Sequence, residues 1–444
     1  MTATPHETDV GVNEHYLDQV VATAAVRDVE ASEDIVAGNG MKLLAKGSRV
    51  DPTVRDRLLN HKLSKPLEQC LVVADAIRPE SLLPTAEKLL DLHPFLRELC
   101  KSERSQAVTD SLAQVRLSPQ LQSLFTFYAG QQDERIAHAV AAALLALGLA
   151  RRVLPGDIEQ HRLILLAGLL HDVGELYIDP VLFKKGTRLA PEQWRHIVTH
   201  PVVGHRVLRD MPGAGKAVAE AVLQHHERLD GFGYPSGLSA QALPLAGQVV
   251  AAAERLVGLM GSAGAPLTHA SVAAKFMPGE FHPALSRALE AASRAAGTGA
   301  MPPATASVAD LVPRMLRIAL TMERFGQARE WIEECGAAGS PTLSALVTSN
   351  MRRMERIQQV FSSTGLAGPN PQAQLAQFEV LDDPLLHAEI ASIVREVEWR
   401  LRELERDSLL HAGRLCPADD RIMCDVVARL KGQEVATRPA QATG

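Results

Sequence analysis

Apolar residues recur with helical spacing along most of this chain. Stripes of Ala, Leu and Val alternate with polar, His-rich segments from about 118 to 296, and the same periodicity predicts helices over 311–325, 343–361 and 386–410. Apolar residues make up 46% of the chain and aromatic residues only 4%, so Ala and Leu, which are strong helix formers, supply much of any core. We therefore predict a mainly α protein.

A different pattern marks residues 33–75, where short apolar runs alternate with turn residues. Between Asp34 and Gly47, two such runs flank a Gly-Asn-Gly sequence, which predicts a β-hairpin. Asp51-Pro52 fits a helix N-cap followed by proline at the first helical position, and 71–73 fits a third strand. These features predict a small α+β module, in which no residue pattern points to catalysis.

The patterns and composition changes divide the chain into seven segments. A Gly/Pro/Ala-rich stretch after 296 is typical of a linker, and both ends of the chain are polar. We expect a disordered tail at 1–32, the α+β module at 33–75, a helical linker at 76–117, a central helical domain at 118–296, a linker at 297–310, a helical C-terminal region at 311–433 and a disordered tail at 434–444.

Charge and cysteine content exclude several classes of protein. The net charge of −6 provides no overall attraction to nucleic acid or to an anionic membrane. The five cysteines are odd in number and form no CxxC pair, so a disulfide framework is not expected. The first residues lack an apolar signal-peptide stretch, and the longest apolar run, 136–150, contains His138 and is too short to span a bilayer. We expect a cytoplasmic protein that binds neither nucleic acid nor a membrane.

Histidines and carboxylates occur in an ordered series after residue 163. An apolar helical run ends directly in His171-Asp172; His200 follows, then His225-His226-Glu227 and the hexapeptide Asp230-Gly-Phe-Gly-Tyr-Pro235. Each motif alone has an ordinary explanation, such as a helix end, two surface histidines or a tight turn, but their combination rarely arises by chance. Imidazoles and carboxylates suit Fe, Mn or Zn, and an aspartate next to a histidine can bridge two ions that activate water for attack on a phosphoester. We interpret His138, His196 and His205 as surface or core histidines.

This series resembles the HD-GYP family, a branch of the HD phosphohydrolase superfamily. His171-Asp172-Val-Gly is similar to the HD motif of the family, and the segment from Lys184 to Gly204 has its order and spacing. His225-His226-Glu227 and Asp230–Pro235 resemble the HHE and DGxGYP motifs. The resemblance covers about 118–296, which gives a predicted all-helical HD-GYP domain between the small N-terminal α+β module and the helical C-terminal region.

The resemblance implies a metal-dependent phosphodiesterase. Members hold iron or manganese and hydrolyse cyclic di-GMP to linear pGpG or to GMP. Residue by residue, Asp172 is expected to bridge two metals, His171 to bind the first, and His200, His225 and His226 to bind the second. The substrate or partner loop comprises Asp230, Gly231, Gly233, Tyr234 and Pro235, with Lys184 nearby. Its Gly-Tyr-Pro part implies partners that carry diguanylate cyclase domains.

Several positions depart from the family pattern. Counting back from 147–149, the first metal-binding histidine of the family falls on Gln132, and a glutamate ligand of trinuclear members falls on Tyr128. The lysine that ends the HD motif is Glu175, and a later aspartate ligand is Glu254. A basic phosphate-binding segment is replaced by 260–266, which has no Arg or Lys. We retain Asp172 and Glu175 as catalytic candidates, Glu254 as a candidate ligand, and Glu175 as an alternative substitute ligand.

These departures leave more than one hypothesis open. The chain is expected to bind one metal firmly and a second weakly or not at all, so one or two ions. The first functional hypothesis is hydrolysis of cyclic di-GMP. The alternative is a catalytically impaired domain that serves as a metal-containing nucleotide-binding or protein-interaction module, and a third is hydrolysis of another phosphoester. Alternating charge over 396–405 is typical of a solvated helix or of helix pairing, including self-association.

Overall fold

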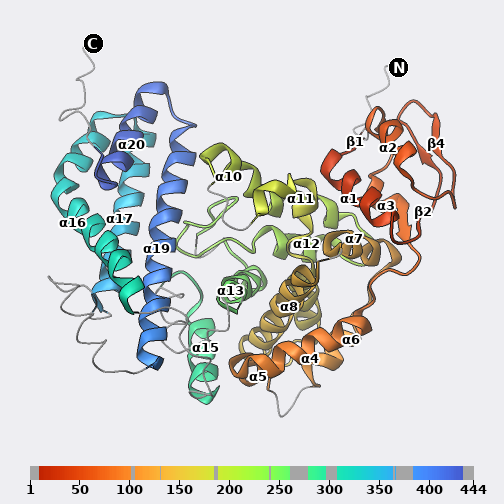
Figure 1. Ribbon diagram of the computed structural model, residues 1–444, viewed down its shortest axis with the longest axis horizontal. Helices are drawn as coiled ribbons and strands as arrows, with labels where there is room; N and C mark the ends of the chain where they lie inside the picture. The colour runs from red at the N-terminus through yellow and green to blue at the C-terminus, as the bar shows by residue number, and fades with distance from the viewer. Residues whose placement is uncertain are drawn as a thin grey trace. The chain divides into compact units, whose positions relative to one another are not determined.

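The computed structural model describes residues 10–101, 106–130, 132–184, 189–239, 242–260, 279–296, 308–363, 366 and 384–433. Helices dominate these residues, as the sequence predicts (Figure 1). The chain forms two compact units, one of residues 1–188, 196–267 and 278–299 and the other of residues 189–195, 268–277 and 300–444. Each is described by itself.

The N-terminal module consists of short antiparallel strand pairs and three helices. The predicted hairpin is confirmed, because β3 (Ile35–Val36) pairs with β4 (Lys42–Leu44). The predicted third strand, β6 (Leu71–Val73), pairs with β2 (Val29–Ala31). Asp51 caps its helix as predicted, with its side chain accepting from the backbone N–H groups of Thr53 and Val54. The remaining elements are β1 (Val10–Gly11), β5 (Lys62–Leu63), α1 (Glu14–Ala24), α2 (Pro52–Leu59) and α3 (Leu67–Cys70).

The prediction of a disordered tail over 1–32 is wrong from residue 10 onward. Asn13 caps α1 by accepting from the Tyr16 N–H at 3.0 Å, and Tyr16, Leu17 and Val20 are buried. The Tyr16 ring stacks on that of Tyr177, 5.0 Å between centroids, and the Asn13 side-chain amide donates to the Tyr177 carbonyl at 3.1 Å. The order of α1 therefore depends on contacts with a residue more than 160 positions away, which local pattern does not reveal.

The helices of the first unit pack around α8 (Asp133–Val153). Residues 139–150 of α8 are buried, with α9 and α13 packed against it. α4 and α5 also contact α8, so the segment predicted as a linker over 76–117 packs into this unit (Figure 1). Length and composition would allow α8 to cross a membrane, but 67% of its most apolar window is buried inside the protein, as in a core helix.

The helical elements are η1 (Pro79–Leu82), α4 (Leu83–Leu92), α5 (Pro94–Cys100), α6 (Val108–Ala113), α7 (Pro119–Ala129), α8 (Asp133–Val153), α9 (Ile158–Leu170), η2 (Val173–Tyr177), η3 (Pro180–Phe183), α10 (Pro191–Ile197), α11 (His200–Arg209), α12 (Gly215–Leu223), α13 (Leu245–Met260) and α15 (Pro283–Ala296), with α10 divided between the two units.

The second unit packs four long helices around an apolar core. These are α16 (Val308–Ala338), α17 (Pro341–Ser363), α19 (Pro384–Ala412) and α20 (Pro417–Leu430). The three predicted C-terminal helices are confirmed. Charges of the alternating 396–405 stretch pair with neighbouring helices, because Glu398 lies 2.6 Å from Arg314 and Glu403 lies 3.0 Å from Arg353. Of the two interpretations of the alternating charge over 396–405, a solvated helix face or helix pairing, these ion pairs favour helix pairing within the unit.

Candidate metal centre

The His-Asp dipeptide lies where a buried helix ends. Residues 164–170 of α9 are all buried, which fixes the position of His171 and Asp172 directly after them. η2 begins at Val173 and turns the chain back toward α11, whose first residue is His200. His171 has no exposed surface, and Asp172 is 8% exposed.

Gly174 allows η2 to lie directly against α11. A Cβ atom built at this position would lie only 2.0 Å from the carbonyl oxygen of His200, well inside van der Waals contact. Any larger residue would push the two segments apart, and with them Asp172 and His200. The Val-Gly that completes the His-Asp motif therefore has a steric role in assembling the site.

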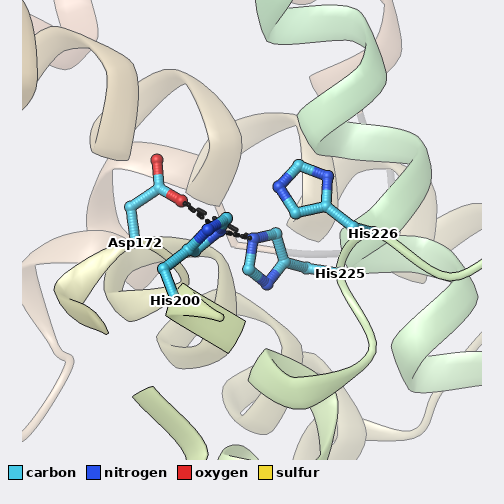
Figure 2. A group of neighbouring side chains, drawn as sticks. All are labelled: Asp172, His200, His225 and His226. Carbon is cyan, nitrogen blue, oxygen red and sulfur yellow. Dashed lines mark hydrogen bonds and ion pairs between the residues drawn. The ribbon is translucent and has the colours of Figure 1, made fainter. Parts of the chain in front are cut away.

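Asp172, His200, His225 and His226 form a first group of potential metal ligands (Figure 2). Their ligand atoms all lie within 4.8 Å of one another. Nε2 of His200 is 2.9 Å from Nε2 of His225, and Oδ1 of Asp172 is 3.4 Å and 3.5 Å from these two nitrogens. Residues from three separate parts of the chain converge because α9, α11 and α12 end or begin here.

His138, His171 and Glu254 form a second group. Nε2 of His138 lies 3.1 Å from Nε2 of His171, and Oε2 of Glu254 lies 3.2 Å and 3.1 Å from these two nitrogens. The second carboxylate oxygen of Asp172, Oδ2, lies 3.2 Å from His138 and 3.1 Å from His171. Asp172 thus presents one oxygen to each group.

Backbone carbonyls orient three of the imidazoles. Nδ1 of His171, His200 and His225 lies 2.8, 2.8 and 2.5 Å from the carbonyl oxygens of Gly168, Ile197 and Val222. Each Nδ1–H therefore donates to a carbonyl, which leaves the Nε2 lone pair directed into the cluster, as metal-ligating histidines require.

The donor set fits divalent cations. Oε2 of Glu254 is buried, has no hydrogen-bond partner among the described residues, and lies 3.2 and 3.1 Å from Nε2 of His138 and His171. Several acceptors at 2.9–3.5 Å from one another repel unless a positive charge lies among them. Imidazole and carboxylate ligands suit Fe, Mn or Zn.

The electrostatics of the cluster are dominated by burial and by its two carboxylates. Burial by itself lowers the pKa of His171, but the charges of Asp172 and Glu254 raise it to about 10. Burial, together with neighbouring imidazoles, lowers the pKa of His225 to about 4. Burial raises the pKa of Asp172, but His171 and the other imidazoles around it lower it well below its usual range. The carboxylates therefore stay ionised and attract cations.

His138 is the functional candidate that the sequence interpretation missed. The sequence predicts a surface or core histidine at this position, whereas the structure places it beside His171 and Glu254. Gln132, onto which the ligand position of the family was counted, is exposed and precedes the first residue of α8. The count back from 147–149 therefore places the ligand six positions before the histidine that joins the cluster. The available sequence signal for this role of His138 is a single histidine near the start of the apolar run 136–150.

The two other departures lie near the cluster but outside both ligand groups of the described residues. Tyr128 is buried on α7, and Glu175 lies in η2. Burial and the charge of Asp172 raise the pKa of Glu175 to about 7. The structure thus does not place Glu175 as a substitute ligand.

The loop over 230–235 is held rigidly next to the first group. The carboxylate of Glu227 accepts from the backbone N–H groups of Ser236 at 2.7 Å and Leu238 at 2.9 Å. A Cβ at Gly233 would lie 2.4 Å from Cα of Glu227, so this position requires glycine. The Tyr234 ring stacks on His226, with centroids 4.4 Å apart. Glu227 therefore positions the loop, a role that its motif alone does not predict.

Other loop candidates have simpler surroundings. Asp230 accepts from the Phe232 N–H at 3.1 Å, whereas Gly231 and Pro235 are half-buried. Lys184 is exposed after η3. The neighbouring basic residues Lys185 and Arg188, and positions 261–266 of the non-basic segment, fall outside the described residues.

Comparisons with known proteins agree with the geometry. Residues 129–278 match the HD domain family. The chain is 40% identical over 110 residues to the cyclic di-GMP phosphodiesterase PA4108 of Pseudomonas aeruginosa, covering 24% of this chain and 26% of that protein. It is 34% identical over 131 residues to the cyclic di-GMP phosphodiesterase response regulator RpfG of Xanthomonas campestris, covering 29% and 32%. It is 29% identical over 161 residues to the 3'3'-cGAMP-specific phosphodiesterase 1 of Vibrio cholerae, covering 36% and 34%. The matches thus span about a quarter to a third of the length of these relatives.

Proposed function

From the premise that residues 129–278 form an HD domain of the HD-GYP family, we propose that this chain is a metal-dependent phosphodiesterase of cyclic dinucleotides. The observation that carries the proposal is the carboxylate of Asp172, which presents Oδ2 to His138 and His171 and Oδ1 to His200 and His225. A carboxylate shared in this way suits a pair of cations.

We propose that the centre holds two ions, iron or manganese. His138, His171 and Glu254 with Oδ2 of Asp172 would hold one, and His200, His225 and His226 with Oδ1 would hold the other. When bound, such a pair supplies an activated water at neutral pH and stabilises negative charge on phosphoester oxygens. This assignment replaces the expectation of one firm site, because His138 supplies the ligand that Gln132 does not.

The protein residues around the ions orient and confine the substrate. Carbonyl groups fix three imidazoles, and the hydrogen bonds of Glu227 fix the 230–235 loop before substrate binds. Tyr234, stacked on His226, gives the site an aromatic wall. Such preorganisation reduces the reorganisation needed during phosphoester cleavage.

The names of the relatives indicate the substrate class. Two of them are cyclic di-GMP phosphodiesterases and another is specific for 3'3'-cGAMP, so both compounds are candidate substrates. We propose cyclic di-GMP as the substrate, cleaved to pGpG or GMP. The half-buried Gly-Tyr-Pro loop is the proposed contact for diguanylate cyclase-domain partners.

One observation favours a second candidate, a metal-containing module that binds nucleotide or protein without turnover. Glu175 places a carboxyl beside Asp172 where catalytic members carry lysine. The pKa of about 7 leaves this carboxyl partly ionised at neutral pH, and its anionic form repels a phosphoester. Loss of one stabilising donor costs about 3–4 kcal/mol of transition-state stabilisation.

The deciding experiment is a product assay on the full chain. Purified protein is incubated with Mn²⁺ or Fe²⁺ and either cyclic di-GMP or 3'3'-cGAMP, and products are separated by chromatography. We expect linear dinucleotide or mononucleotide from wild type and none from Asp172→Asn, which removes the shared charge at nearly constant size. Gln132→Ala, at an exposed position, is the control and retains activity. Absence of product from folded, metal-loaded wild type favours the binding module.

A further inference from the structure

A cavity lies in the first unit, outside the metal centre. Its volume is about 1120 Å³, and residues of α6, α8, α9 and α12 line it. None of the histidines and carboxylates of the two ligand groups is among its lining residues. The volume exceeds that of a single small anion and is at the upper end of cavities that bind small molecules.

The cavity carries an excess of positive charge. Arg116, Arg151 and Arg162 line it, against one carboxylate, that of Glu80. Arg116 and Arg162 are exposed, whereas Arg151 is half-buried. His161 adds an imidazole that reaches the Leu154 carbonyl at 2.8 Å. Guanidinium groups recognise phosphate and carboxylate with paired N–H donors.

Arg151 has unused hydrogen-bonding capacity. Its Nη2 donates to the Ser111 hydroxyl at 2.8 Å, but its Nε and Nη1 are buried and have no hydrogen-bond partner among the residues that the structure describes. A buried charged donor without an acceptor is costly, so such groups are normally satisfied by protein, water or ligand. Its neighbour Arg152 differs, since Nε and Nη2 donate to the carbonyls of Leu99 and Glu98 at 3.1 and 2.6 Å. Arg152 does not line the cavity.

Apolar side chains cover the rest of the wall. Leu147, Leu163, Leu166 and Val218 line the cavity, and Ile158 at the start of α9 is 62% exposed. The N-terminus of α12 also lies at the cavity and has no side-chain cap, so its backbone N–H groups add to the positive potential. An anionic group with an attached apolar ring system matches this mixture.

We propose that this cavity is a second ligand site, which binds a phosphate-bearing small molecule of nucleotide size. The site is independent of the proposed phosphodiesterase activity, because it shares no residue with the metal centre. The same two helices connect them: α9 and α12 begin at the cavity, and His171 and His225 follow their ends. Leu166, the last lining residue of α9, precedes His171 by five residues, and Val218 of α12 precedes His225 by seven, which is about 8 Å and about 10 Å at 1.5 Å per residue.

The test measures binding in a chain whose metal centre is disabled. Full-length Asp172→Asn protein in EDTA is titrated calorimetrically with GTP, cyclic di-GMP and pyrophosphate as separate probes. We expect one site for at least one nucleotide and weaker binding of pyrophosphate, which lacks a base. Adding Arg151→Gln and Arg162→Gln together should weaken that binding about 10- to 100-fold, as for loss of charge-assisted hydrogen bonds. Arg152→Gln is the matched control and should leave it unchanged.

Several results would overturn the proposal. These are no binding of any probe, equal binding with Arg151 and Arg162 replaced, or an equal loss with Arg152→Gln. Thermal unfolding checks the fold of each variant. If Arg151→Gln does not fold, Arg116→Gln with Arg162→Gln, both at exposed side chains, carries the same expectation. Tight pyrophosphate binding equal to that of the nucleotides would refute the nucleotide-sized ligand. Because activity is measured with an intact metal centre, failure of either proposal leaves the other standing.

Discussion

Replacing His138 with alanine separates the ligand set seen in the structure from the one counted along the sequence. Nε2 of His138 lies 3.2 Å from Oδ2 of Asp172 and from Oε2 of Glu254. The second group has three members, His138, His171 and Glu254, so replacing His138 removes one of them. Gln132 is exposed, and its replacement removes nothing from either group. The two variants therefore differ in predicted metal content although they lie only six positions apart.

The expected loss of affinity is large. Changing residues that merely orient metal ligands costs about 10- to 100-fold in metal affinity. Loss of a direct ligand should cost at least the upper value, which is about 2.7 kcal/mol. The second group, with four ligands, should be much less affected.

The assay is metal content per chain. Protein is loaded with Mn²⁺, desalted and analysed by inductively coupled plasma mass spectrometry, with circular dichroism as the folding control. We expect about two ions for wild type and Gln132→Ala, and about one for His138→Ala. Two ions retained by His138→Ala would refute the role of His138. A single ion in wild type would restore the earlier hypothesis of one firm site.

Three further predictions follow from the same geometry. Gly174→Ala should destabilise the fold by about 1–3 kcal/mol or more, since its Cβ would lie 2.0 Å from the His200 carbonyl oxygen; urea unfolding with unchanged stability would contradict this. In EDTA, the folded protein should lose stability as the pH rises from 7 to 9, because the pKa of His171 is raised to about 10 in the folded state. The protonated imidazole contributes its full stabilisation of the fold below pH 6.5, and this contribution is lost as the pH approaches 10. Urea midpoints that rise between pH 7 and 9 would exclude this assignment. Glu175→Lys should raise the rate of cyclic di-GMP hydrolysis by about 10-fold or more, with Glu175→Gln intermediate, because a cation replaces a carboxyl that is partly ionised at neutral pH. Unchanged initial rates in the chromatographic assay would show that residue 175 does not limit turnover.

Local chemistry made much of the fold predictable. The Gly-Asn-Gly hairpin, the Asp51 cap and the long C-terminal helices follow from turn residues, capping residues and periodicity within a few positions of each other. The HD-GYP resemblance also identified residues that lie together, including Asp172 and His200. These residues belong to short motifs that are recognised directly, so their positions do not have to be counted from a distant part of the chain.

The missed features depend on distant contacts. His138 lies on α8, and its ligand role follows from its position 3.1 Å from His171, 33 residues further along the chain, which periodicity does not reveal. α1 is short, and its buried Tyr16 packs on Tyr177 rather than on a neighbour in sequence. In both cases the deciding partner is encoded elsewhere in the chain.

The stacking of Tyr16 on Tyr177 has a practical consequence for dissecting this protein. Tyr177 ends η2, whose first residue follows Asp172, so the N-terminal module buttresses the segment that carries the shared carboxylate. A truncation that starts at residue 118, where the domain boundary was drawn from sequence, would strip away this support and expose the Tyr177 ring to water. Loss of activity in such a fragment would then reflect the missing contact between Tyr16 and Tyr177, and would not test the proposed phosphodiesterase activity.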